Sequence, residues 1–92
     1  MNNQFDIQGE IFFLGQEEKI SATFSKVTVV LKIENGTRIE YVPFDFLNPT
    51  NVFNGFKVGH HAHISFKLRG NRHKTDNTKF FPSNEGLSIS KI

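Results

Sequence analysis

The 92-residue sequence contains no cysteine and no tryptophan, and only one methionine and one tyrosine. Without cysteine the chain can form no disulfide framework, no zinc ribbon and no thiol nucleophile. The longest apolar runs are four residues (Ile11–Leu14) and three residues (Val29–Leu31), far too short to span a membrane. The first ten residues are polar and carry two acids, which is atypical of a signal peptide. We therefore expect a soluble protein of the cytoplasm with no membrane partner.

Motifs for catalysis are also missing. The sequence has no glycine-rich phosphate loop and no Gly-x-Ser-x-Gly motif, and among its carboxylates only Glu17 and Glu18 are adjacent. It therefore predicts no enzyme, no catalytic residues, no cofactor and no small-molecule substrate. The length predicts one domain over residues 1–92, and eleven phenylalanines supply most of the bulk of its small core.

Positive charge is concentrated in one segment. The net charge is +2, but residues 57–79 hold six lysines and arginines against one acid, which gives +5, and residues 1–56 hold four against seven, which gives −3. All four histidines also lie in the basic segment. Such a segment favours a polyanion as partner. The alternative is a solvated basic face with no partner.

Alternating apolar and polar residues predict an all-β chain. The side chains expected to share one side of their strand are Phe5, Ile7, Ile11 and Phe13, then Val27, Val29, Leu31 and Ile33, then Ala62, Ile64, Phe66 and Leu68. Gly9 indicates a bend or a close approach, and Gly86 a bulge. The predicted strands cover residues 4–14, 23–33, 38–47 and 61–69, with a last strand within 79–91.

A hairpin is predicted around Asn35-Gly36, because this pair suits a type I′ turn between two strands. A two-residue loop there would place Ile33 opposite Arg38, so that the residue numbers of each pair sum to 71. The face with Val27 and Val29 would then be core. The opposite face would be the outer surface, with Lys26, Thr28, Val30, Lys32, Ile39, Tyr41 and Asp45.

One short helix is predicted over Asn48–Phe56, because Asn48 suits the N-cap and Pro49 the first turn. The element order is then β-β-β-α-β-β. Five strands with a helix between the third and fourth is the layout of an OB-fold barrel. An SH3-like barrel is the alternative, but it has no helix at that place.

The predicted outer surface carries basic and aromatic residues. Basic side chains follow a phosphate backbone, and aromatic rings offer flat faces to bases. An OB-fold binds oligonucleotides on its second and third strands and on the loops between strands one and two and strands four and five. The candidate nucleic-acid-binding residues are Lys26, Lys32, Tyr41, Lys67, Arg69, Arg72, His73, Lys74, Lys79, Phe80 and Phe81.

Each candidate also has a plain structural interpretation. Tyr41 could be an ordinary half-buried strand residue, and Phe80 and Phe81 cannot both face outward on a regular strand. His61 and His63 share a strand face and could bind a metal with His60 or His73, but no acid lies between residues 46 and 75. We therefore predict no metal site.

The stretch from Tyr41 to Ile89 resembles the second half of bacterial and phage single-stranded-DNA-binding proteins of the SSB and primosomal type. The matching features are Tyr41, the segment Asn48–Phe56, Lys57-Val58-Gly59, the strand His61–Phe66, Leu68-Arg69 and Arg72-His73. The resemblance implies base stacking by Tyr41 and His73, and phosphate contacts by Arg69 and Arg72. The tryptophans usual in that family are absent.

Together these features predict sequence-tolerant binding of single-stranded DNA in replication, recombination or repair, with RNA as the other candidate ligand. The resemblance implies a homo-oligomer, a dimer or a tetramer, in the cytoplasm, or in the host cytoplasm if a phage encodes the chain. The alternative function is an OB-fold module that binds a protein, as an assembly or inhibitory subunit.

Overall fold

The computed structural model describes residues 3–49, 53–72 and 80–92, and the side chains of these except residues 71, 72, 80 and 81. The described residues form six strands and no helix. Five of the strands confirm the predicted ones to within a few residues; the short β2 lies in the segment expected to be a loop. The strands are β1 (Gln4–Leu14), β2 (Glu18–Ser21), β3 (Phe24–Asn35), β4 (Arg38–Leu47), β5 (His61–Arg72) and β6 (Phe80–Lys91).

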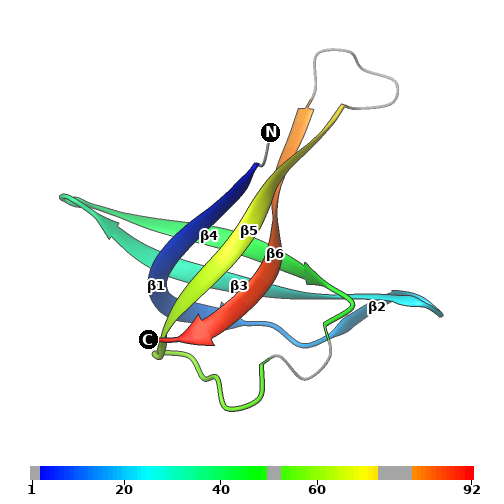
Figure 1. Cartoon of the computed structure of the whole chain (residues 1–92), viewed down its shortest axis with the longest axis horizontal. Coiled ribbons are helices and arrows are strands. Elements are labelled where there is room, and N and C mark those ends of the chain that lie inside the picture. Colours follow the sequence, from blue (N-terminus) through cyan, green and yellow to red (C-terminus); the bar gives the residue numbers. More distant parts are fainter. Residues whose placement is uncertain (1–2, 50–52, 73–79) are drawn as a thin grey trace.

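The sheet closes into a five-stranded barrel because β1 has two partners. Its first part, Gln4–Glu10, pairs with β5, and its second part, Glu10–Leu14, pairs with β3. The order β1-β5-β6-β4-β3 therefore returns to β1, and β2 extends the sheet beyond β3. In Figure 1, β1, β5 and β6 cross in front of β3 and β4. This closed all-β barrel is consistent with the predicted OB-fold.

Gly9 lies next to the residue where β1 changes partners. A Cβ atom there would lie 3.0 Å from the Lys32 carbonyl oxygen and 3.1 Å from Cγ1 of Ile33. The absence of a side chain thus lets β1 pass close over β3, which confirms the expected close approach.

The β3–β4 hairpin has the predicted faces but a different register. The loop is Gly36-Thr37, with Asn35 opposite Arg38, so the residue numbers of each pair sum to 73 and not 71. Gly36 has φ 65°, while neither Asn35 nor Thr37 has a positive φ. A positive φ at the first central position only is typical of type II′, not of the expected type I′. Because the error is two residues, every side chain keeps its face.

The predicted helix over Asn48–Phe56 is not found in the part of this segment that the structure describes. Asn48 has φ 47°, outside the right-handed helical region, and residues 53–55 form a turn that the Phe56 N–H closes on the Phe53 carbonyl oxygen at 3.0 Å. Residues 50–52 lie outside the described residues. Phe53 and Phe56 of this segment still pack against the core. Within the described ranges, no helix is long and apolar enough to cross a membrane.

The core lies between the strands and is entirely apolar in the described part of the chain. Phe44 packs edge-on against Phe66 with ring centroids 5.0 Å apart, and Phe46 does the same with Phe53 at 5.1 Å. The fully or almost fully buried side chains are Ile11, Val27, Val29, Leu31, Phe44, Phe46, Ala62 and Ile64. As predicted, β3 and β5 contribute alternate residues, but Leu68 lies past the end of the core and is exposed.

The barrel closes where the Phe46 ring covers Gly86. The two residues are partners in the short parallel pairing of β4 with β6, and a Cβ atom on Gly86 would lie 2.4–2.5 Å from three carbons of that ring. The β5–β6 register also shifts here, with Phe66 opposite Gly86 and Ser65 opposite Ser88. This irregularity confirms the predicted bulge at Gly86.

We predict that Gly86→Ala destabilises the protein by about 1–3 kcal/mol, because the added methyl group overpacks the Phe46 ring. Urea denaturation measures the loss as a lower midpoint at an unchanged slope. Gly70→Ala is the matched control, since a Cβ atom there meets nothing within 4 Å. Equal midpoints for the two variants would contradict this account of the closure.

Candidate nucleic-acid interface

An exposed aromatic pair lies on the outer face of β3 and β4. Tyr41 is 52% exposed and lies directly opposite Lys32, as a residue of the predicted outer surface should. The ring of Phe12, also 52% exposed, packs edge-on against Tyr41 with centroids 4.8 Å apart. Two half-exposed rings beside a lysine offer stacking faces and a positive charge to one ligand.

A bulge in β1 follows Ile11 and turns Phe13 to the outer side, where simple alternation already places Phe12. Ile11 is opposite Leu31 and Phe13 opposite Val30, so Phe12 is the extra residue. The prediction that Phe13 shares the core side with Ile11 is therefore wrong, since Phe13 is 50% exposed and Ile11 is fully buried. Sequence reasoning missed Phe12 as a candidate. The signal was in the alternation itself, since a strand with Ile11 on the core side has Phe12 facing outward.

Lys26 lies at the other end of the same face. It is opposite Leu47 on β4 and opposite Glu18 on β2. Glu17, in the same connection, accepts a hydrogen bond from the Ser25 hydroxyl at 2.7 Å. The acids on this side weaken the attraction of Lys26 for a phosphate backbone. Lys32 likewise has an acid opposite it, Glu10 of β1, so the Lys32 end is distinguished by the exposed rings of Phe12 and Tyr41 and not by its charge.

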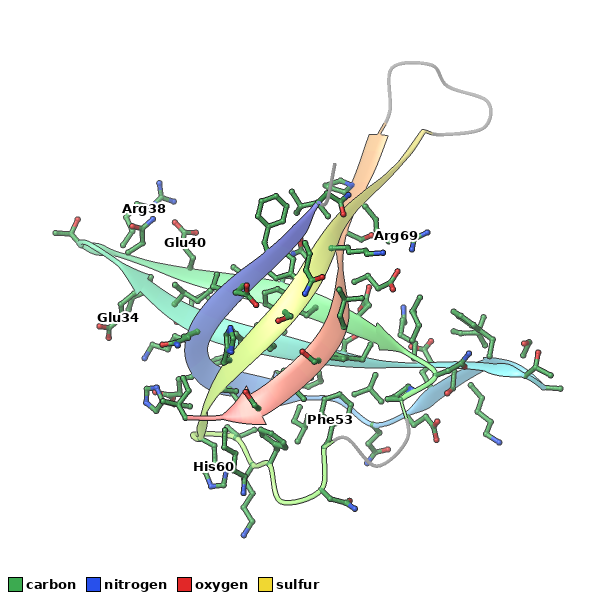
Figure 2. The ribbon with its side chains drawn as sticks, in the orientation of Figure 1. Glu34, Arg38, Glu40, Phe53, His60 and Arg69 are labelled. Carbon is green, nitrogen blue, oxygen red and sulfur yellow. The ribbon has the colours of Figure 1, made fainter. Side chains whose placement is uncertain are left out.

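Lys67 and Arg69 lie on a different part of the surface, on β5. The Arg69 guanidinium forms an ion pair with Glu85 of β6, and Lys67 is opposite the same Glu85. Figure 2 shows Arg69 beside the β5–β6 hairpin. Asp45 of β4 is the neighbour of Glu85 across the parallel pairing and accepts a hydrogen bond from Thr28 Oγ1 at 2.8 Å. Two carboxylates thus separate Lys32 from the basic residues of β5.

A hollow of about 440 Å³ lies where these carboxylates meet the basic residues of β5. It lies between the outer face of β4 and the base of the β5–β6 hairpin. The Asn84 side-chain amide donates a hydrogen bond to the Pro43 carbonyl oxygen at 3.0 Å and so ties β6 to β4. The residues around the hollow are Pro43, Asp45, Leu68, Arg69, Pro82, Ser83 and Asn84.

The remaining candidates belong to the end of the β5–β6 hairpin. Arg72 is paired with Phe80, and Phe81 with Asn71, but their side chains are not described. His73, Lys74 and Lys79 lie outside the described residues. The backbone therefore places Arg72, Phe80 and Phe81 on the hairpin beyond the hollow.

His63 of β5 and His60, just before that strand, make contacts that involve no metal ligand set. The His63 ring lies 3.3 Å from the carboxylate of Asp6, which also accepts a hydrogen bond from the Ser65 hydroxyl. His60 precedes β5, and its N–H donates to the Lys57 carbonyl oxygen at 3.1 Å. Within residues 3–49, 53–72 and 80–92, no three histidine or acidic side chains are arranged to hold a metal ion.

Comparison with known proteins assigns the family. Residues 6–90 match a family described as a domain of unknown function, DUF3127. The chain belongs to the DUF3127 family. No curated protein matches the sequence.

Solved structures share the fold of this DUF3127 domain. The N-terminal domain of PriB from Thermoanaerobacter tencongensis has a TM-score of 0.72 at 20% identity, covering 100% of this chain and 98% of that one. The mitochondrial single-stranded DNA binding protein Rim1 from S. cerevisiae has a TM-score of 0.78 at 13% identity, with coverages of 100% and 97%. The resemblance to SSB and primosomal proteins seen in the sequence is thus confirmed as a shared fold.

We predict that the Phe12 and Tyr41 rings stabilise each other in the DUF3127 domain by about 0.5–1.5 kcal/mol, as aromatic pairs do. A double-mutant cycle of Phe12→Ala and Tyr41→Ala, followed by urea denaturation, measures this coupling. Phe5→Ala with Tyr41→Ala is the control cycle, because Phe5 packs against Phe66 and not against Tyr41. Additive losses in both cycles would show that the pair is not in contact in solution.

Proposed function

We propose that this protein binds single-stranded DNA without a strict sequence requirement. The observation that carries the proposal is the exposed pair Phe12 and Tyr41 beside Lys32 on the outer face of the barrel. Exposed rings are costly to a free protein and useful to one that stacks bases, and stacking tolerates any base because every base has a π-face.

The position of the pair supports the proposal. In an OB-fold, oligonucleotides bind on the face that corresponds here to β3 and β4, and on the connections β1–β3 and β5–β6. The β1–β3 connection carries Glu17 and Glu18, which repel phosphate. The β5–β6 hairpin carries Lys67, Arg69 and Arg72 on its first strand. A strand that runs from Tyr41 past the hollow toward that hairpin meets aromatic, apolar and basic groups in turn.

The structural neighbours support it as well. One of them is a mitochondrial single-stranded DNA binding protein, and the PriB domain is dimeric. By analogy with the dimeric PriB domain we propose that this protein acts as a homo-oligomer in DNA replication, recombination or repair, and from its sequence we propose the cytoplasm as its location. A second copy would join two modest binding sites on one strand and raise the affinity.

The direct test is fluorescence anisotropy of a labelled oligo-dT titrated with protein at several salt concentrations. We expect binding that weakens linearly in log salt, because phosphate contacts release counterions. A matched duplex should bind more weakly, since its bases cannot reach the rings, and an RNA strand compares the two nucleic acids. If no oligonucleotide binds at low salt, the proposal fails and the exposed rings should be tested against a protein partner.

Tyr41 provides an intrinsic fluorescent probe of oligo-dT binding. We predict that Tyr41→Ala weakens oligo-dT binding by about 1–3 kcal/mol, and that Tyr41→Phe largely preserves it because a ring remains. The chain has one tyrosine and no tryptophan, so its tyrosine emission reports on Tyr41 alone. We expect oligo-dT to quench this emission. Unchanged emission at saturating DNA would place the strand elsewhere.

Because Arg69 forms an ion pair, we expect Lys67 and Arg69 to contribute differently to the salt dependence of DNA binding. We predict that Lys67→Gln lowers the slope of log affinity against log salt by about 0.7, the value for one lost phosphate contact on a single strand. Arg69→Gln should lower the slope much less, because Glu85 already compensates the Arg69 charge. Titrations at several salt concentrations measure both slopes. A larger effect of Arg69→Gln would mean that Glu85 releases the guanidinium to DNA.

A further inference from the structure

The proposed DNA-binding face contains a carboxylate where a phosphate cannot lie. Asp45 is a half-buried residue on the outer face of β4, held by the 2.8 Å hydrogen bond from Thr28. An ionised carboxylate only accepts hydrogen bonds, and it repels the DNA backbone. A strand that crosses this point must therefore turn a base toward Asp45 and keep its phosphates away.

The hollow beside Asp45 has the walls that a base requires. Pro43, Leu68 and Pro82 present apolar surface, and the volume of 440 Å³ lies within the range of about 300–1,000 Å³ of small-molecule sites. The hydrogen bond from Asn84 to the Pro43 carbonyl fixes one side of the hollow. The site therefore combines apolar walls with a fixed hydrogen-bond acceptor.

Arg69 completes the hollow. Its ion pair with Glu85 compensates its charge and restrains the planar guanidinium. Bases stack on guanidinium planes as they do on aromatic rings. Arg69 is thus better placed to support a base than to neutralise a phosphate, which differs from the role that the sequence resemblance implied.

We propose that this hollow accepts a guanine base and that Asp45 is the residue that selects it. This inference rests on the proposed binding of single-stranded DNA. Guanine presents two adjacent donors, N1–H and the N2 amino group, which match the two oxygens of one carboxylate. Cytosine and adenine offer one amino group on the corresponding edge. Thymine offers a single N–H between two carbonyl oxygens, which the carboxylate repels. The bond from Thr28 leaves further acceptor positions on Asp45, because each carboxylate oxygen accepts more than one hydrogen bond.

The test compares oligonucleotides of about 15 nucleotides, near the upper site size of one OB-fold. One is all thymine, and the others carry guanine, cytosine, adenine or hypoxanthine at the same regular intervals in thymine. Anisotropy competition at one salt concentration should show the guanine strand binding at least about fivefold tighter than all-thymine. Hypoxanthine lacks the N2 amino group, so its strand should lose most of this gain.

Asp45→Asn tests the residue. An asparagine pairs with adenine, so the variant should lose its preference for guanine and gain one for adenine. It should bind all-thymine DNA at least as well as the wild type, which shows that it is folded. Glu40→Gln is the matched control, since it removes one negative charge from the same strand outside the hollow and should keep the guanine preference.

The outcomes separate this inference from the proposed function. Equal binding of all the strands by the wild type would overturn the guanine site and leave single-stranded DNA binding intact. Guanine preference that persists in Asp45→Asn would overturn the role of Asp45. Absence of binding to every strand would overturn the proposed function, and the guanine site with it.

Discussion

Closure of the barrel requires the Phe46 ring to pack directly on Gly86. The parallel pairing of β4 with β6 that closes the barrel is short, with Asp45 opposite Glu85 and Phe46 opposite Gly86. Side-chain packing must therefore stabilise this short pairing in addition to its backbone hydrogen bonds. The same ring touches Phe53 of the β4–β5 connection. One phenylalanine thus joins the closing strands, the core and the β4–β5 connection, and only glycine leaves room for it.

Closure at this point also determines the chemistry of the surface. Because Asp45 and Glu85 become neighbours, acids separate the lysine beside Tyr41 from the basic residues of β5. Glu85 then compensates Arg69, and Asn84 reaches the backbone of Pro43 to form the hollow. The face is a sequence of aromatic, acidic and basic regions. Such a pattern suits a strand whose bases and phosphates are held in different places.

The bulge in β1 has a comparable effect at the other end of this face. One extra residue lets Ile11 remain in the core while Phe12 and Phe13 become exposed. Phe12 then meets Tyr41, a residue that lies 29 positions further along the chain. A regular strand would have kept Phe13 on the core side with Ile11, whereas Phe12 faces outward in either case.

Local sequence patterns were sufficient to predict five of the six strands and the faces of most of their side chains, with Phe13 as an exception. Val27, Val29 and Leu31 alternate with polar neighbours, and this local period survives even the two-residue error in the hairpin register, because a shift of two preserves the face. The same local reasoning placed Tyr41 outside correctly. It predicted a helix from Asn48 and Pro49, since capping residues indicate where a helix can start and not whether tertiary packing retains it.

The contacts between distant strands could be read from the folded chain alone. Alternation shows the side of a strand on which a residue lies, but carries no information about which distant strand becomes its neighbour. The ion pair of Arg69 with Glu85, the neighbouring carboxylates and the Phe12–Tyr41 contact all follow from the strand pairings of the closed barrel. The barrel closes because the apolar residues of β1, β3, β4 and β5 must be buried together in one small core, which the pattern of a single segment does not reveal.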